Sequence, residues 1–232
     1  LDMPRPQIAI MFAFVLVAAL IGGYLLFNVL DAVRGGTARA QASVEENLSR
    51  EVSYDLPALT SYITLNDDEI KQAVADAGLT VIDKGGMSDD PEAALELIKL
   101  PSDVSELDAG LMYNKGVSKL SASEAALLLN GSWTLDADRS DGTSMRLRYA
   151  DFSSGSLDAA IDAAIAAEGF DPATIAEDGM GVDEVGNTFK QGTVDVDGTA
   201  YTWKVSALPL SEMYDISGLP ETAVYVGVRL SS

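Results

Sequence analysis

The sequence predicts an α+β protein with one N-terminal transmembrane helix, followed by a head in which an antiparallel sheet packs against short amphipathic helices. Three observations lead to this fold class. Residues 7–30 form an apolar run without a charged residue. Asp-Gly turns separate segments rich in β-branched and aromatic residues, which is typical of hairpins. Capping sequences precede short stretches with helical periodicity, which is typical of amphipathic helices.

The apolar run at 7–30 reads QIAIMFAFVLVAALIGGYLLFNVL and is long enough to cross a bilayer. A helix rises about 1.5 Å per residue, and the hydrocarbon core is about 30 Å thick. Within lipid, a single segment satisfies its backbone groups only as a helix. Ala18 and Gly22, like Ala19 and Gly23, are spaced four residues apart. Small residues at this spacing allow close approach of a second helix, so we predict a helix–helix contact there.

The transmembrane prediction divides the chain into four parts. Pro4 and Pro6 keep the first residues extended. Gly35 and Gly36 follow the apolar run and predict a hinge, while Pro57 ends the next helical pattern. The expected parts are a tail at 1–6, a transmembrane helix at 7–30, a juxtamembrane stalk at 31–56 and an acidic head at 57–232, with a possible division of the head into 57–120 and 121–232.

Helices in the head are predicted from their caps. Asn66 with Glu69, and Ser121 with Glu124, have the spacing of a capping box. Ser156 precedes another apolar-periodic run, and Asp90-Pro91 has the sequence of a helix start. The predicted helices cover 70–77, 91–98, 122–129 and 157–168, with shorter turns after 171 and 211; the segment 102–116 is left open between helix and loop.

Strands are predicted from turns and alternation. Asp141-Gly142 and Asp197-Gly198 are turn sequences, and the final segment AVYVGVRL alternates between apolar and polar residues. The predicted strands cover 79–82, 133–137, 144–149, 189–196, 200–205 and 223–230. We therefore expect an antiparallel sheet of about five strands with Ala-rich helices on one face.

Composition excludes several classes of function. Asp and Glu number 36 against 15 Lys and Arg, giving a formal charge of −21. Such a chain is not expected to bind nucleic acid, which requires concentrated cations, nor to lie on anionic lipid. It has no Cys and no His, which excludes disulfides, thiolate or Ser–His–Asp catalysis and the usual zinc sites.

No catalytic, cofactor-binding or metal-binding residue is predicted. Asp136, Asp138 and Asp141 lie in the sequence DADRSDG, which has some of the spacing of a calcium loop. The twelfth position of that loop is Leu147 instead of the required Glu, so we interpret the segment as a polar hairpin turn. Ser118-Lys119 lies outside any recognisable nucleophile motif. The sequence therefore predicts a protein that is not an enzyme.

Charges beside the apolar run leave its orientation open. Arg5 precedes the run, whereas Arg34 and Arg39 follow it, an asymmetry that favours a cytoplasmic head. The alternative is a signal anchor with an exported head, which we favour for a large acidic domain on one N-terminal anchor. The expected function is a cell-membrane interaction, scaffold or accessory-subunit role. Expected partners are the lipid bilayer and, through the anchor helix, other membrane proteins or copies of this chain.

An apolar N-terminal helix, a stalk and an antiparallel head together resemble the plan of type IV pilins and their relatives. The chain begins at Leu1 with Met3 close behind, which allows either a processed leader or a start at Met3. The resemblance implies an alternative function, a filament subunit whose hydrophobic N-terminal helices form the filament core.

Overall fold

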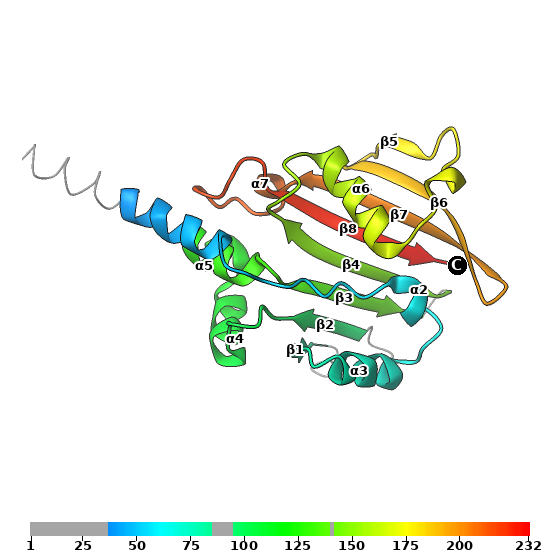
Figure 1. Cartoon of the computed structure of the whole chain (residues 1–232), viewed down its shortest axis with the longest axis horizontal. Coiled ribbons are helices and arrows are strands. Elements are labelled where there is room, and N and C mark those ends of the chain that lie inside the picture. The colour runs from blue at the N-terminus through cyan, green and yellow to red at the C-terminus, as the bar shows by residue number, and fades with distance from the viewer. Residues whose placement is uncertain (1–36, 85–94, 140–141) are drawn as a thin grey trace, which may run out of the picture. The chain divides into compact units, whose positions relative to one another are not determined.

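The computed structural model describes residues 37–84, 95–139 and 142–232 of the chain (Figure 1). The predicted transmembrane helix at 7–30, with its small residues Ala18, Ala19, Gly22 and Gly23, lies outside these ranges. Among the helices within the described ranges, none is both long and apolar enough to cross a membrane. The boundaries of the tail, anchor, stalk and head stay predictions.

One continuous antiparallel sheet organises residues 44–232, which form a compact unit. Its eight strands have the order β1-β2-β3-β4-β8-β7-β6-β5. The C-terminal strand β8 therefore lies in the middle, where it joins the meander of strands β5 to β8 to strand β4 of the first four strands (Figure 1). The strands are β1 (Val81–Asp83), β2 (Leu95–Lys99), β3 (Trp133–Asp138), β4 (Ser144–Asp151), β5 (Met180–Val182), β6 (Thr188–Val196), β7 (Thr199–Pro209) and β8 (Val224–Ser231).

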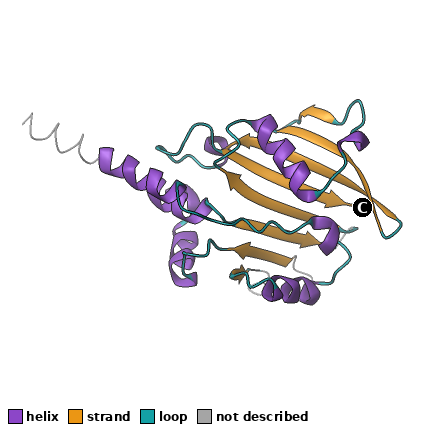
Figure 2. Cartoon of the chain, in the orientation of Figure 1, coloured by secondary structure: helices purple, strands orange, loops and turns teal. Residues whose placement is uncertain are grey.

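Helices cover both faces of this sheet, and each face has its own core (Figure 2). The main core lies beneath α2 (Leu59–Tyr62), α3 (Asp67–Asp76) and α6 (Leu157–Glu168). The second core is smaller and lies beneath α4 (Glu106–Lys115), α5 (Ala122–Leu129) and α7 (Leu210–Met213). Two 3-10 turns, η2 (Val117–Lys119) and η3 (Pro172–Thr174), also occur. Residues 37–48, which precede all of these elements, are helical as well.

Local signals determine the starts of several helices. The capping boxes of Asn66 with Glu69 and of Ser121 with Glu124 both form, with each side chain bonded to the other residue's backbone N–H. Ser156 caps α6, and Gly169 ends it in the left-handed conformation at φ 71°. These helix starts confirm the prediction from sequence, because capping depends on residues within one turn of each other.

The predicted helix at 91–98 is wrong over its second half, which is strand β2. Leu95 and Leu97 pack into the main core, while Ile98 packs into the second core. Leu95 and Ile98 are three residues apart, a spacing that also fits one face of a helix, so the apolar pattern does not distinguish this strand from a buried helix. Residues 91–94 lie outside the described ranges.

The predicted sheet of about five strands on one helical layer is also too small. The sheet has eight strands, which include β2 and the short edge strand β5 beside the six predicted segments, and helices lie on both faces. The open segment 102–116 contains α4, whose N-cap is Ser105. The coarser prediction, α+β with an antiparallel sheet and short helices, is confirmed.

Residues 44–56, here called the docked segment, are attached to the rest of the unit by polar contacts. The Asn47 amide donates to the Ser123 carbonyl at 2.9 Å, and Arg50 donates to the Leu127 carbonyl at 2.8 Å. The Trp133 indole donates to the Tyr54 carbonyl at 2.8 Å. These bonds join the segment to α5 and β3, far away in sequence.

Candidate functional site

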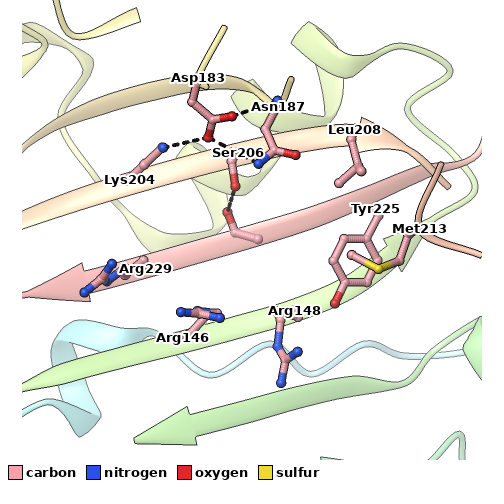
Figure 3. Close-up of a pocket in the computed structure, with 11 residues that line it drawn as sticks. Arg146, Arg148, Asp183, Asn187, Lys204, Ser206, Leu208, Met213, Tyr225 and Arg229 are labelled. Atoms are coloured by element: carbon pink, nitrogen blue, oxygen red, sulfur yellow. Dashed lines mark hydrogen bonds and ion pairs between the residues drawn. The ribbon is translucent and has the colours of Figure 1, made fainter. Parts of the chain in front are cut away.

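Four cationic side chains share the sheet face opposite the main core. Arg146 and Arg148 come from β4, Lys204 from β7 and Arg229 from β8. We call these four residues the cationic face. Successive side chains of a strand alternate between faces, and the intervening residues Met145, Leu147, Trp203, Val205, Val228 and Leu230 are all in the main core. Alternation therefore places the cations together on the other side of the sheet (Figure 3).

Strand register aligns three of these cations in one row across the sheet. Arg146 is directly opposite Arg229, and Arg229 is directly opposite Lys204. Like charges at such positions destabilise a sheet. The contacts of Arg229 with its two neighbours therefore oppose folding, although Asp136 lies opposite Arg146 at one end of the row and Asp183 pairs with Lys204 at the other. A costly feature of this kind is expected where a protein uses it to bind.

A shallow pocket of about 280 Å³ opens beside this row. Gly227 of β8 lines the pocket and lies opposite Arg148 on one side and Ser206 on the other. A Cβ atom at Gly227 would lie 3.2 Å from the Ser206 hydroxyl, so a side chain there would fill the hollow. The lining residues are Arg146, Arg148, Asp183, Asn187, Lys204, Ser206, Leu208, Met213, Tyr225, Gly227 and Arg229.

Two of the cations have carboxylate partners. Arg148 forms an ion pair with Asp136 at 2.6 Å. Lys204 forms one with Asp183 at 2.9 Å, which Figure 3 shows. Burial disfavours ionisation of Asp183, but hydrogen bonds from Lys204 and Asn187 outweigh this and lower its pKa to about 2. Asp183 is therefore a permanent anion that holds Lys204 in place at neutral pH.

The other two cations, Arg146 and Arg229, have no carboxylate partner in an ion pair within the described residues. No hydrogen bond or ion pair joins Arg146 to another of the described residues, and its side chain is exposed. Arg229 is also exposed and donates only its Nε hydrogen, to the Ser144 hydroxyl at 3.1 Å. The Nε of Arg148 is buried and has no acceptor within the described part of the chain. The face therefore offers several guanidinium donors to an incoming acceptor.

The far end of the pocket is apolar. Leu208 and Tyr225 are half-buried there, and Met213 is 40% exposed (Figure 3). Burial raises the pKa of Tyr225, although Arg148 beside its ring opposes the rise. Tyr225 is thus neutral at physiological pH and presents a ring with one polar end. The whole site combines anion-binding donors with a hydrophobic surface.

The acidic motif noted in the sequence is divided by the structure. Asp136 forms an ion pair with Arg148 of the cationic face, whereas Asp138 is exposed at the end of β3. Asp141 lies outside the described residues, where the predicted helix–helix contact also lies. Within the described ranges, no three Asp or Glu side chains are grouped so as to hold a metal ion.

The cationic face itself was not predicted from the sequence. Its local signal is the alternation Arg146-Leu147-Arg148, which marks two cations on one side of a strand. Lys204 and Arg229 are far away along the chain and become neighbours only through the pairing of β8 with both β4 and β7. No protein-family model, curated protein or solved structure significantly matches this chain. Its function is therefore inferred from the side chains of the head.

Proposed function

We propose that this chain is a membrane-anchored, non-enzymatic interaction protein whose exported head binds an anionic group of a partner at the cationic face. The observation that carries this proposal is the row formed by Arg146, Arg229 and Lys204. Three cations held side by side favour an anion from outside, because Asp183 pairs only with Lys204, and Asp136 lies opposite Arg146 but pairs with Arg148. The bilayer anchor at 7–30 would hold the head near other membrane proteins.

A binding role is supported over catalysis by the state of the acids at the site. Asp136 is paired with Arg148, and Asp183 accepts hydrogen bonds from Lys204 and Asn187. Neither carboxylate is therefore positioned as a general base with a free lone pair toward the pocket. The chain has no His or Cys to supply another nucleophile or base.

The absence of cysteine from the chain allows a sharp test of both orientation and contact. Thr202 is exposed on β7, on the same face as Lys204. A Thr202→Cys variant of the full chain in its native membrane carries the single thiol on the proposed surface. Labelling in intact cells with a membrane-impermeant maleimide is expected if the head is exported. Labelling only after permeabilisation would overturn that part of the proposal.

The same variant tests the contact. A bifunctional cross-linker on Thr202→Cys is expected to give an adduct of one defined mass, and the adduct should be lost when Arg146→Gln and Arg229→Gln are added. The matched control is Ala163→Cys, which is exposed on α6 at the opposite face. An adduct that is equally strong at Ala163, or that persists without the arginines, would contradict the proposal. Sedimentation as a long polymer would instead support the filament subunit.

A further inference from the structure

We propose that the occupant of the pocket is an extended acidic segment of a partner protein, with carboxylates on alternate residues and a bulky apolar side chain two positions further. The inference rests on the proposed function and names the chemistry of its partner. In this arrangement the carboxylates bind along the line from Arg229 to Arg148, and the apolar side chain packs against Tyr225, Leu208 and Met213.

The spacing of the site along β8 favours an extended peptide. Arg229, Gly227 and Tyr225 are alternate residues on one side of this strand. With a rise of about 3.4 Å per residue, the charged and aromatic ends are about 14 Å apart. A small inorganic anion cannot reach both ends. An extended segment has the same period of two, so its residues 1, 3 and 5 lie above Arg229, Gly227 and Tyr225 in turn.

Donors for two carboxylates are present on this line. Arg146 and Arg229 are directly opposite each other, and their terminal N–H groups have no acceptor among the described residues. At the next pair of facing residues, Arg148 lies opposite Gly227, and its buried Nε has no acceptor among the described residues. Because Gly227 has no side chain, a carboxylate above it has room to approach Arg148. A planar guanidinium binds a carboxylate with paired hydrogen bonds.

Carboxylates fit the surroundings of this pocket better than phosphate does. Asp183 lines the pocket, and its pKa is lowered to about 2, so it stays ionised. This fixed anion repels a doubly charged phosphate more strongly than a single carboxylate. The formal charge of −21 also opposes approach of the head to an anionic membrane surface. A peptide with separated carboxylates matches the limited positive charge of the face.

The test uses the full-length protein in detergent and the synthetic peptide acetyl-Glu-Ala-Glu-Ala-Phe-amide, with binding measured by titration calorimetry. The two glutamates and the phenylalanine lie on one side of the extended peptide. We expect saturable binding that weakens about tenfold or more in an Arg146→Gln/Arg229→Gln variant. Lys115→Gln/Lys119→Gln is the control, since it removes the same charge from exposed positions and is expected to leave binding unchanged.

Two further peptides separate the contributions of the ends. Replacing both glutamates by glutamine should abolish binding, and replacing phenylalanine by alanine should weaken it several-fold. Gly227→Ala should also weaken it several-fold by filling the hollow, with circular dichroism used to verify that the variant is folded. Loss of peptide binding in both charge variants alike would show a non-specific effect of net charge and overturn the proposal.

Inorganic phosphate and vesicles of phosphatidylcholine with phosphatidylserine are the competing ligands. Tighter binding of phosphate or of the vesicles than of the peptide would overturn the assignment to an acidic segment. Absence of peptide binding at millimolar concentration would do the same. If the Thr202 adduct nevertheless depended on Arg146 and Arg229, the cationic face would remain the interaction surface and only the ligand class would be wrong. Loss of both results would reject the proposed function as well.

Discussion

The carboxylate of Glu168, at the end of α6, accepts a hydrogen bond at 2.8 Å from the backbone N–H of Leu59, at the start of α2. The two residues are 109 positions apart in sequence. Glu168 is 5% exposed and Leu59 is fully buried. This bond satisfies one of the unpaired N–H groups at the start of α2, and so holds the segment entering the head against α6.

The buried Glu168 makes stability depend on pH. Burial raises its pKa to about 7, and the Leu59 hydrogen bond only partly opposes this. A carboxyl with a raised pKa favours the folded state when protonated, so its contribution is complete below about pH 4.5 and is lost as pH rises through about 7. Between pH 5 and pH 8, this one group should lower the free energy of unfolding by roughly 2 kcal/mol.

Glu168→Gln isolates this effect, since the amide oxygen still accepts from Leu59 but does not ionise. Urea unfolding of both proteins should be measured at pH 5 and pH 8. The free energy of unfolding of the variant should rise relative to that of the wild type as the pH is raised. The exposed Glu106→Gln is the control and should not alter the pH dependence. An unchanged difference between Glu168→Gln and wild type at the two pH values would mean that Glu168 titrates normally.

Lys99 on β2 has a structural role that the sequence alone does not reveal. Its side chain is 4% exposed, and its Nζ donates to the Gly131 carbonyl at 2.8 Å and to the Ser53 carbonyl, with Asp55 at 3.7 Å. Burial lowers the pKa of Lys99, although Asp55 opposes the shift. Lys99 thus joins the docked segment to the turn before β3.

Replacing Lys99 by Met should destabilise the head by roughly 2 kcal/mol, because the carbonyls lose their donor while the side-chain volume is kept. Urea unfolding measures the loss, and hydrogen exchange should show faster exchange over residues 44–56. The same change at the exposed Lys119 is the control and should be nearly neutral. Equal stability of the two variants would mean that the Lys99 hydrogen bonds are not needed.

Two glycines should respond in opposite directions to the same substitution. A Cβ atom at Gly192 on β6 would lie 2.5 Å from the Trp203 ring and 2.5 Å from the Thr174 hydroxyl, in the packed main core. Gly110 lies within α4, and nothing is within 4 Å of its Cβ position. Gly192→Ala should cost roughly 1–3 kcal/mol by overpacking. Gly110→Ala should stabilise by about 0.5–1 kcal/mol through helix propensity.

Thermal and urea unfolding of both alanine variants provide the comparison. Trp203 stacks on Phe170 with ring centroids 5.0 Å apart, so displacement of the indole by Gly192→Ala should also change the near-ultraviolet circular dichroism. A neutral Gly192→Ala would indicate that β6 and Trp203 can separate without loss. A destabilising Gly110→Ala would indicate that α4 uses this position for a contact.

Features that depend on neighbouring residues could be predicted from the sequence. The caps of α3 and α5 form as expected, and the Asp197-Gly198 turn has the two positive φ angles, 53° and 82°, of a tight hairpin. β2 could not be recognised, because its apolar residues Leu95 and Ile98 have a helical spacing although they pack on opposite faces of the strand. The apolar anchor is an equally local pattern, and it stays a prediction.

The cationic face could not be predicted because it depends on strand order. β8 follows β7 in sequence and then pairs with β4 on its other edge, which brings Arg229 between Arg146 and Lys204. Nothing in the spacing of these residues specifies that insertion. Local alternation identifies which side chains share a side of one strand, but the register between distant strands is set by the whole core.

The cationic row predicts a protein that is less stable than a simple variant of itself. Arg146→Thr removes the cation opposite Arg229 and places a residue with high strand propensity on β4. We expect this variant to be more stable than the wild type by up to about 1 kcal/mol, measured by urea unfolding at low salt. Because repulsion between exposed charges is screened, the difference should shrink when salt is raised to about 1 M.

Lys119→Thr is the matched control, since it removes the same charge from an exposed position outside the sheet. Removing a cation from a chain of charge −21 should lower stability slightly through greater overall repulsion. Opposite signs for the two variants would therefore trace the gain at Arg146 to its neighbours Arg229 and Lys204. If Arg146→Thr were destabilising at low salt, the attraction between Arg146 and Asp136, which lies opposite it on β3, would outweigh the repulsion from Arg229. Arg146 would then be neutralised by Asp136 before any partner arrives.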